Sequence, residues 1–438
     1  MATSKTINGD CLEELKKLDD NSIDLLCTDP PYGYGFMGKH WDTFQEKQST
    51  KSQTVGWMSP GMKKSTYGMK EFFVPIWKEA LRVLKPGSFS FVMSAPRSDV
   101  QMVMLQTLQE AGFDVSFTPI YWTYATGFPK AMNVGKKTEK GNLEGSYAGY
   151  QPKPAVEVVI VAMKPLDQNT YVGQALNNQK GVTWLDDCRI PFGDMNDKEQ
   201  FDKDNVAGQM NYDGRYEKDS GKMYEGGWDK PMRKTTKRKP REENTVFKTS
   251  GFKSENNDTA EASPFGRFAA NLLISDDILE KDFSRFYSLD SWWEDRLTKL
   301  PDEIKRTFPF LAVPKPSKSE KNDGLDKFDK QQKIFNGQSD KPSKDMKGVE
   351  QKFTTQPSAN NHPTVKPTTL MSYLVTLGSR KGDVVLDPFA GSGTTAISCV
   401  FSERNYLLIE REKEYYKILK ARIKKAENPA GIVQHEWF

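Results

Sequence analysis

Short apolar runs alternate with amphipathic segments near both ends of the 438-residue chain. In the first 165 residues, apolar residues at helical spacing predict helices over 72–84 and 99–112, the second ending at Gly112. Runs rich in β-branched and aromatic residues predict strands at 22–29, 88–95, 117–124 and 156–164. This alternation predicts a mostly parallel sheet with helices on both faces.

The pattern weakens in the middle of the chain, which is polar and rich in glycine and lysine from residue 166 to 357. A stretch of this length is too long for an ordinary loop, so it predicts an inserted domain. Beyond it, strands are expected at 383–389 and 405–410, and helices at 394–403 and 412–426. We therefore expect one α/β sheet built from both ends of the chain, with domain boundaries at 1–165, 166–357 and 358–438.

Composition narrows the class of protein. The mean hydropathy is −0.70, yet 9 Trp, 25 Phe and 16 Tyr indicate a folded chain rather than a disordered one. The net charge of +4 indicates no particular partner. Four widely spaced cysteines and three histidines argue against a metal site and favour a reducing cytoplasm. No apolar run is long enough to cross a membrane, so an intracellular, soluble protein is expected.

A glycine-rich loop joins a predicted strand to a predicted helix in DPFAGSGTT, residues 387–395. Gly391 and Gly393 allow a tight turn and the close approach of a ligand. The loop lacks the lysine that a phosphate-binding loop carries, and it lacks the GxGxxG spacing of a dinucleotide-binding site. It therefore suits a cationic ligand better than a triphosphate. Glu410, at the end of the next strand, is placed to accept hydrogen bonds from ribose hydroxyls. The alternative is an ordinary α/β turn.

Three motifs in a particular order resemble one family. DPPY occupies 29–32, NHPTVKP occupies 361–367 and FAGSGT occupies 389–394. Together they resemble the permuted, beta-class S-adenosylmethionine-dependent DNA amino-methyltransferases, in which the catalytic motif comes first and the cofactor motif follows a target-recognition insert. The resemblance covers about the first 165 and the last 80 residues.

The resemblance implies a fold and a cofactor. The fold would be α/β, a doubly wound, mostly parallel seven-stranded Rossmann-like sheet with a large inserted target-recognition domain, and its missing strand would be KTINGD (5–10). The cofactor would be S-adenosyl-L-methionine. Its expected contacts are Asp10, Asp387, Pro388, Phe389, Ala390, Gly391, Ser392, Gly393, Thr394, Thr395, Glu410, His362, Thr364 and Lys366.

Two of these groups have alternatives. Asp10 would contact the adenine amino group of the cofactor, but it could equally cap the following helix, and both roles are compatible. His362, Thr364 and Lys366 would line the methionine end of the pocket. The alternative is that this segment is a rigid, proline-flanked lead-in to a helix over 368–377.

The DPPY motif suits an amino group as substrate. An exocyclic amino group is a poor nucleophile because its lone pair is delocalised into the ring. The Asp29 carboxylate and the Pro30 carbonyl can each accept one N–H, and Pro31 helps to hold that carbonyl in a fixed direction. Tyr32 can stack on a base that has left the duplex. The alternative is a proline turn with no chemical role.

Two further groups are candidates for contact with DNA. Trp122 and Tyr124 point to the same side of a strand and resemble the family's base-pocket aromatics, although a half-buried aromatic pair is an equal alternative. The segment 230–241 holds seven basic residues in twelve, which suits phosphate contacts unless it is merely a solvated surface. The phosphate contacts expected there are Arg233, Lys234, Lys237, Arg238, Lys239 and Arg241.

The expected activity is site-specific N6-methylation of adenine in double-stranded DNA, because aspartate at the first DPPY position is usual among adenine-directed relatives. Cytosine-N4 methylation is the first alternative. Methylation of RNA or protein, or a catalytically decayed DNA-binding module, is favoured less by the motif order and the intact motifs. A homodimer, a partner restriction nuclease and a phage or cellular origin stay open.

Overall fold

The computed structural model describes residues 4–33, 44, 66, 68–124, 133–137, 141–148, 156–192, 266–267, 270–274, 288–298, 318–330, 334–335, 353–354, 358–360, 362 and 364–427. The chain divides into two compact units, one formed by Met1–Arg189 with Phe268–Phe438 and the other by Ile190–Arg267. In the second unit, Ile190 pairs with Arg267 in an antiparallel bridge, and the Arg267 guanidinium lies 4.8 Å from the Phe192 ring centroid. The role and boundaries of an inserted recognition domain stay a prediction.

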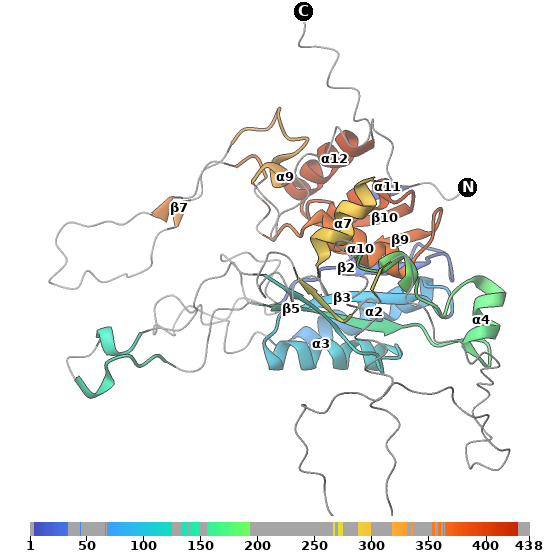
Figure 1. Ribbon diagram of the computed structural model, residues 1–438, viewed down its shortest axis with the longest axis horizontal. Helices are drawn as coiled ribbons and strands as arrows, with labels where there is room; N and C mark the ends of the chain where they lie inside the picture. The colour runs from blue at the N-terminus through green and yellow to red at the C-terminus, as the bar shows by residue number, and fades with distance from the viewer. Residues whose placement is uncertain are drawn as a thin grey trace, which may run out of the picture. The chain divides into compact units, whose positions relative to one another are not determined.

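The first unit is organised around an eight-stranded sheet of order β1-β10-β9-β2-β3-β5-β4-β6 (Figure 1). The first five of these neighbours run parallel, whereas β5 is antiparallel to both β3 and β4. This arrangement confirms the predicted α/β, mostly parallel fold and each of its seven strands. The eighth strand, β6, was not predicted. The strands are β1 (Lys5–Asn8), β2 (Leu25–Thr28), β3 (Phe89–Ser94), β4 (Ile120–Thr123), β5 (Val156–Met163), β6 (Leu272–Ile274), β9 (Val384–Asp387) and β10 (Asn405–Glu410).

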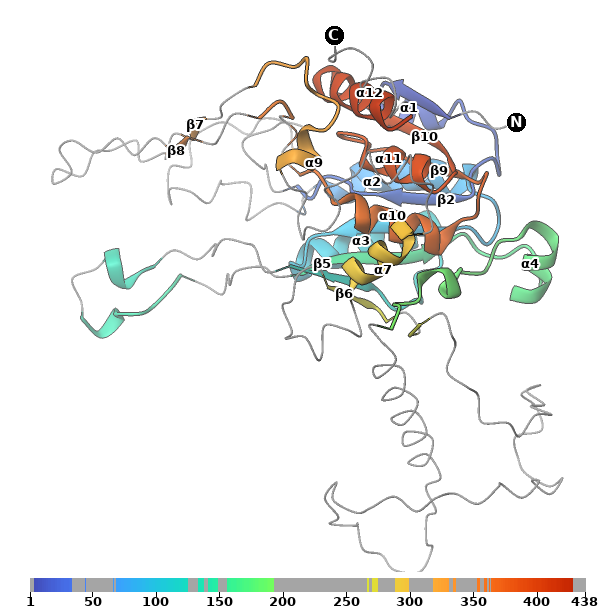
Figure 2. The ribbon, with the colours of Figure 1, turned by 45° about the horizontal axis from the view of Figure 1, so that its top comes forward.

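Helices cover both faces of this sheet. Helices α2 (Met69–Val83) and α3 (Ser98–Ala111) pack together on one face, while α10 (Thr368–Gly378) and α11 (Thr394–Phe401) pack together on the other (Figures 1 and 2). No helix within the described ranges has the length and apolar character that crossing a membrane requires. The remaining elements are α1 (Cys11–Leu15), η4 (Gly135–Lys137), η5 (Gly141–Leu143), α4 (Tyr171–Asn178), η6 (Leu185–Cys188), α7 (Leu289–Thr298), α9 (Lys318–Asn322), β7 (Ile334–Phe335), β8 (Phe353–Thr354) and α12 (Lys413–Glu427).

Local sequence signals explain where these helices begin and end. Asp10 caps α1, because its Oδ1 accepts hydrogen bonds from the backbone N–H groups of Leu12 and Glu13. Gly112 ends α3 at φ +107°, a conformation in which a side chain would be strained. Every residue of α10 is buried, since the helix lies between the sheet and α7.

An aromatic cluster ties α2 to the glycine-rich loop. Phe73 stacks on Trp77 at 5.3 Å between ring centroids, and Phe389 meets both rings edge-on at 5.9 and 6.0 Å. Such edge-on pairs add to the stabilisation from buried area. The cluster therefore fixes the start of the loop against a helix that lies some 300 residues earlier in the sequence.

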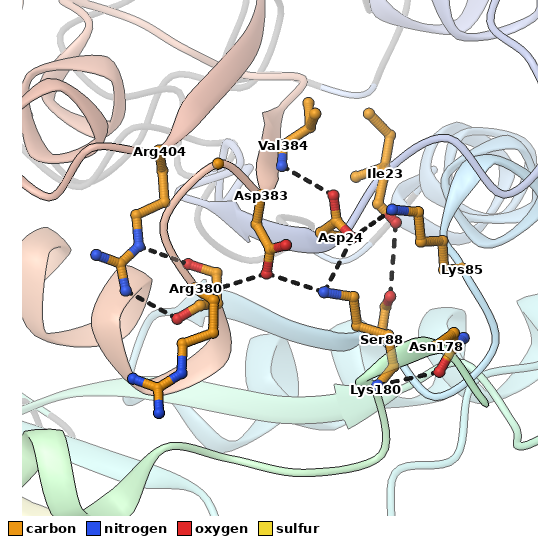
Figure 3. Close-up of polar contacts among 12 residues, drawn as sticks. Ile23, Asp24, Lys85, Ser88, Asn178, Lys180, Arg380, Asp383, Val384 and Arg404 are labelled. Carbon is orange, nitrogen blue, oxygen red and sulfur yellow. Dashed lines mark hydrogen bonds and ion pairs between the residues drawn. The ribbon is translucent and has the colours of Figure 1, made fainter. Parts of the chain in front are cut away.

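An ion network joins the amino end of β2, which Asp24 precedes, to the amino end of β9, which Asp383 precedes (Figure 3). Lys180 Nζ lies 2.9 Å from Asp24 Oδ1 and 2.9 Å from Asp383 Oδ2, and its side chain is 7% exposed. Asp24 also pairs with Lys85 at 2.6 Å and accepts a hydrogen bond from Val384 N at 2.9 Å. Burial acts to raise the pKa of Asp24, but these partners outweigh it and lower the pKa. The ionised network therefore contributes stability that is lost as pH falls through that lowered pKa.

The Lys180→Met substitution is expected to destabilise the protein by about 3–5 kcal/mol, because it leaves the buried Asp24 carboxylate and the partly buried Asp383 carboxylate without their shared cation. The measurement is the free energy of unfolding in urea at neutral pH. Lys381→Met is the matched control, since Lys381 pairs with Glu403 while 69% exposed. The control should change stability by no more than about 0.5 kcal/mol, and equal effects of the two substitutions would contradict the importance of the network.

Candidate active site

Four neighbouring parallel strands end at one cavity. In sheet order these are β1, β10, β9 and β2, so the segments that follow their carboxyl ends share one edge of the sheet. The cavity lies where ligands bind in open α/β sheets. It is lined by Gly9, Asp10, Cys11, Asp29, Pro30, Pro31, Tyr32, Phe72, His362, Thr364, Val365, Lys366, Met371, Asp387, Pro388, Phe389, Ala390, Gly391, Ser392, Thr394, Thr395, Glu410, Arg411, Glu412 and Tyr415.

The lining contains all four residues predicted to be catalytic and every residue predicted to bind the cofactor except Gly393. Gly393 instead begins α11 at φ +82°, where an added Cβ would lie 3.0 Å from Leu419 Cγ. Asp10 caps α1 and also lines the cavity, so the structure is compatible with both of the roles considered for it. The roles assigned to these residues stay predictions.

Asp387 is a buried acceptor that joins the two motifs. Its Oδ1 accepts a hydrogen bond from Thr28 Oγ1 at 2.6 Å, although the two residues are 359 positions apart, and its Oδ2 accepts one from Thr395 Oγ1 at 2.6 Å. Burial raises the pKa of Asp387 to about 6, while these hydroxyl donors act in the opposite direction. The strand that carries DPPY is thus bonded directly to the strand that carries the glycine-rich loop.

Glu410 holds the backbone of that loop. Its Oε2 accepts a hydrogen bond from Gly391 N at 2.8 Å, and its Oε1 accepts one from Glu412 N at 2.8 Å. Burial raises the pKa of Glu410 to about 7, whereas these two backbone donors lower it. Each carboxylate oxygen has a second lone pair, so the side chain can also receive hydroxyl donors from a ligand.

Gly391 is required by the side chain beside it. It adopts φ +53°, and an added Cβ would lie 2.7 Å from His362 Nε2. The His362 ring is held in turn by an edge-on contact with Tyr415 at 4.5 Å and by the Thr364 N–H, which lies 3.4 Å from Nδ1. The segment before α10 and the glycine-rich loop therefore close on one another without room for a side chain.

Arg422 supports the same loop from behind, and the sequence reasoning missed it. Its Nη1 donates to Ser392 O at 2.8 Å, to Ser392 Oγ at 3.0 Å and to Thr394 Oγ1 at 3.3 Å. Burial lowers the pKa of Arg422 to about 10. The sequence nevertheless carried a sign of a buried role for this arginine. Arg422 falls in the stripe of α12 that Tyr415 and Ile418 mark as buried, where an apolar residue is expected.

The Asp29 carboxylate has two partners inside the cavity. Its Oδ1 accepts a hydrogen bond from Tyr32 OH at 2.8 Å, and its Oδ2 forms an ion pair with Lys366 Nζ. Lys366 Nζ also lies 5.8 Å from the Tyr32 ring centroid and 3.5 Å from Glu157 Oε2. Burial acts to lower the pKa of Lys366, but the two carboxylates outweigh it and raise the pKa. The sequence did not predict the pairing of Lys366 with Asp29.

The candidate DNA-contacting groups are placed differently. Trp122 on β4 and Tyr124, which directly follows that strand, have ring centroids 5.0 Å apart and are 1% and 3% exposed. They are outside the cavity lining. The basic run 230–241 lies outside the described residues, as do Asn361 and Pro363 of the NHPTVKP motif. The base-pocket and phosphate assignments therefore stay predictions.

The cavity fits a cationic cofactor. Five acidic side chains line it, which are Asp10, Asp29, Asp387, Glu410 and Glu412. Carboxylates favour a sulfonium or ammonium group and accept hydrogen bonds from ribose hydroxyls. Among the described residues, no three His, Cys, Asp or Glu side chains gather where they could hold a metal ion.

Comparison with known proteins identifies the family. Residues 23–421 match the N6/N4-methyltransferase family described as DNA methylase. The chain therefore belongs to this family, a class whose cofactor is S-adenosyl-L-methionine. Because the match extends over most of the chain, it includes both the DPPY strand and the glycine-rich loop.

Individual relatives match over shorter stretches. The type II methyltransferase M2.MboI of Moraxella bovis is 40% identical over 90 residues, which are 20% of this chain and 32% of that protein. The DNA adenine methyltransferase YhdJ of Escherichia coli (strain K12) is 47% identical over 58 residues, 13% of this chain and 20% of that one. The matched part thus spans a third or less of these relatives. Among solved structures, PvuII DNA methyltransferase (cytosine-N4-specific) aligns with a TM-score of 0.42 and 12% identity over 98% of this chain and 92% of that one.

The Gly391→Ala substitution is expected to weaken S-adenosyl-L-methionine binding by about tenfold or more, because the methyl group would displace His362 and strain a backbone at positive φ. Isothermal titration calorimetry measures the affinity. Gly382→Ala is the control, since Gly382 has φ +84° but nothing within 4 Å of an added Cβ. It should retain the parental affinity, and an equal loss in both variants would exclude the steric explanation.

Proposed function

We propose that this protein is a site-specific DNA methyltransferase that moves a methyl group from S-adenosyl-L-methionine to the exocyclic N6 amino group of adenine. One observation carries the proposal, which is that the Asp29 carboxylate and the loop at Gly391 line the same cavity. Family membership supports the amino-methyltransferase class. An acceptor for an amino group and a pocket for a methyl donor would then lie side by side.

The side chains on the Asp29 side of the cavity suit the chemistry of an amino group. Asp29 and the carbonyl of Pro30 would each accept one N–H of the amino group, which favours a pyramidal nitrogen with a localised lone pair. Tyr32, held by its bond to Asp29, would stack on the base after it leaves the duplex. S-adenosyl-L-methionine supplies an electrophilic methyl group when it is bound. The amino nitrogen would bond to that methyl carbon as the methyl–sulfur bond breaks, and the electron pair would stay on sulfur, which becomes a neutral thioether. The nitrogen would then give one N–H proton to solvent water and end neutral.

Adenine is the proposed base for two reasons. Aspartate occupies the first position of DPPY, as is usual in adenine-directed relatives of the permuted class. The matched segment of YhdJ, which is described as a DNA adenine methyltransferase, supports the same choice. Cytosine-N4 methylation is the alternative product, because a cytosine amino group presents the same two N–H donors.

Double-stranded DNA is the proposed substrate, with residues 230–241 supplying phosphate contacts. The relatives described as type II methyltransferases favour a restriction-modification setting with a partner nuclease. A homodimer is a further proposal, based on the resemblance to the permuted class. An intracellular location agrees with these partners.

The Asp29→Ala substitution should lower the rate of methyl transfer by at least about 100-fold while cofactor affinity persists, because the variant loses the acceptor but not the cofactor loop. The purified protein is incubated with unmethylated DNA and S-adenosyl-L-methionine, and the digested nucleosides are analysed by mass spectrometry. Asp20→Ala, at a side chain that is 68% exposed, is the control and should retain parental activity. Near-parental activity of Asp29→Ala would refute the assignment, whereas N4-methylcytosine as product would refute only the choice of adenine.

Replacing the six candidate phosphate contacts in 230–241 by glutamine should weaken DNA binding and flatten its salt dependence. Each lost phosphate contact lowers the slope of log affinity against log salt by about 0.9. Fluorescence anisotropy at several salt concentrations measures this slope. The control replaces Lys16 and Lys17, which pair with Glu13 and Glu14 on α1. A slope unchanged from the parent would show that the run makes no phosphate contacts.

A further inference from the structure

The carboxylate of Asp29 is engaged before any base arrives. Tyr32 OH donates to one oxygen, and the Lys366 ammonium pairs with the other. Lys366 is buried, with a side-chain exposure of only 9%. The Asp29–Lys366 pair is formally neutral, so alone it offers little attraction to an amino nitrogen that becomes positively charged as it gains a methyl group.

A second carboxylate reaches the same lysine from another part of the sheet. Glu157 Oε2 lies 3.5 Å from Lys366 Nζ, and this oxygen is buried without a hydrogen-bond partner. Glu157 lies at the amino end of β5, which runs antiparallel to β3. That end of β5 is therefore at the edge of the sheet where the parallel strands finish, which explains how Glu157 reaches Lys366.

We infer that Glu157 is a positioning residue that shares Lys366 with Asp29 and takes over its ammonium group when the amino group of the base binds Asp29. This inference rests on the proposed function. An acidic partner for the displaced lysine matters because an unpaired buried ammonium is strongly unfavourable. With Glu157 at 3.5 Å, Lys366 needs only a small movement to remain paired.

The charge of the group supports the same role. Asp29, Glu157 and Lys366 together carry one net negative charge when all three are ionised, whereas Asp29 and Lys366 alone carry none. The extra negative charge would stabilise positive charge on the amino nitrogen, and it would do so without occupying Asp29. Glu157 would thus act through Lys366 rather than through contact with the base.

Glu157 also adjoins the aromatic pair predicted for the base pocket. It faces Trp122 in the register between β5 and β4. Burial raises the pKa of the Tyr124 phenol, and the neighbouring Glu157 carboxylate raises it further. Among the described residues, Lys366 faces Asp29 and Tyr32 from the segment after β2 and Glu157 from β5, while Tyr124, which directly follows β4, interacts with Glu157.

Glu157→Gln tests the inference through kcat for DNA methylation and its pH profile. The substitution should lower kcat at pH 7 by roughly tenfold or more, a typical coupling between neighbouring charged residues, without weakening cofactor binding. It removes one of the two carboxylates that raise the pKa of Lys366, so Lys366 loses its proton at a lower pH. Any rise in rate that follows from release of Asp29 at alkaline pH should therefore begin at a lower pH in the variant than in the parent.

Two more variants keep the test decisive. Glu157→Asp preserves the charge and should restore at least part of the lost rate, even if glutamine perturbs the fold. In a Lys366→Met background, Glu157→Gln should cause a much smaller further loss, since Glu157 would have no lysine to position. Parental kcat and pH profile in Glu157→Gln, or an equal loss in both backgrounds, would overturn the inference. The Asp29→Ala variant is assayed alongside, because its loss of activity tests the proposed function independently of Glu157.

Discussion

The parallel pairing of β2 with β9 is the constraint on which the site depends. Leu25 and Leu26 pair with Val385 and Leu386, two segments separated by 360 positions in the chain. The pairing is reinforced at both ends by buried polar contacts, from Asp24 to the backbone of Val384 at one edge and from Thr28 to Asp387 at the other. Because parallel strands point the same way, the loops that follow both strands must open at one edge of the sheet.

Two of the carboxylates at that edge of the sheet are buried away from water. Asp387 and Glu410 are buried acids with raised pKa values, and each is held mainly by donors that fix the loop geometry. Burying such groups is unfavourable for the protein alone, but it sharpens their interaction with a cationic ligand, since the effective dielectric is low. Burial of these carboxylates therefore destabilises the unliganded protein and also strengthens its attraction for a cationic ligand.

Much of the fold was readable from the sequence, because its signals are local. The seven predicted strands and the helix boundaries at Asp10 and Gly112 follow from apolar periodicity and capping. The short strand β6 and helix α4 were missed, since three or eight residues in a polar stretch carry too little periodicity. Their existence depends on the partners that tertiary structure provides.

The motif residues of the site could also be predicted, whereas their connections could not. Asp29 and Gly391 belong to short motifs with a chemical logic of their own, and both line the cavity. The contact between Lys366 and Asp29 joins positions 337 residues apart, and Glu157 reaches them only because β5 is antiparallel. Nothing in the local sequence around Glu157 distinguishes it from an ordinary strand residue. The direction of β5, rather than a motif, brings this glutamate within 3.5 Å of Lys366, a residue that lines the cavity. The balance of charge beside the cavity therefore has to be worked out from the topology of the sheet.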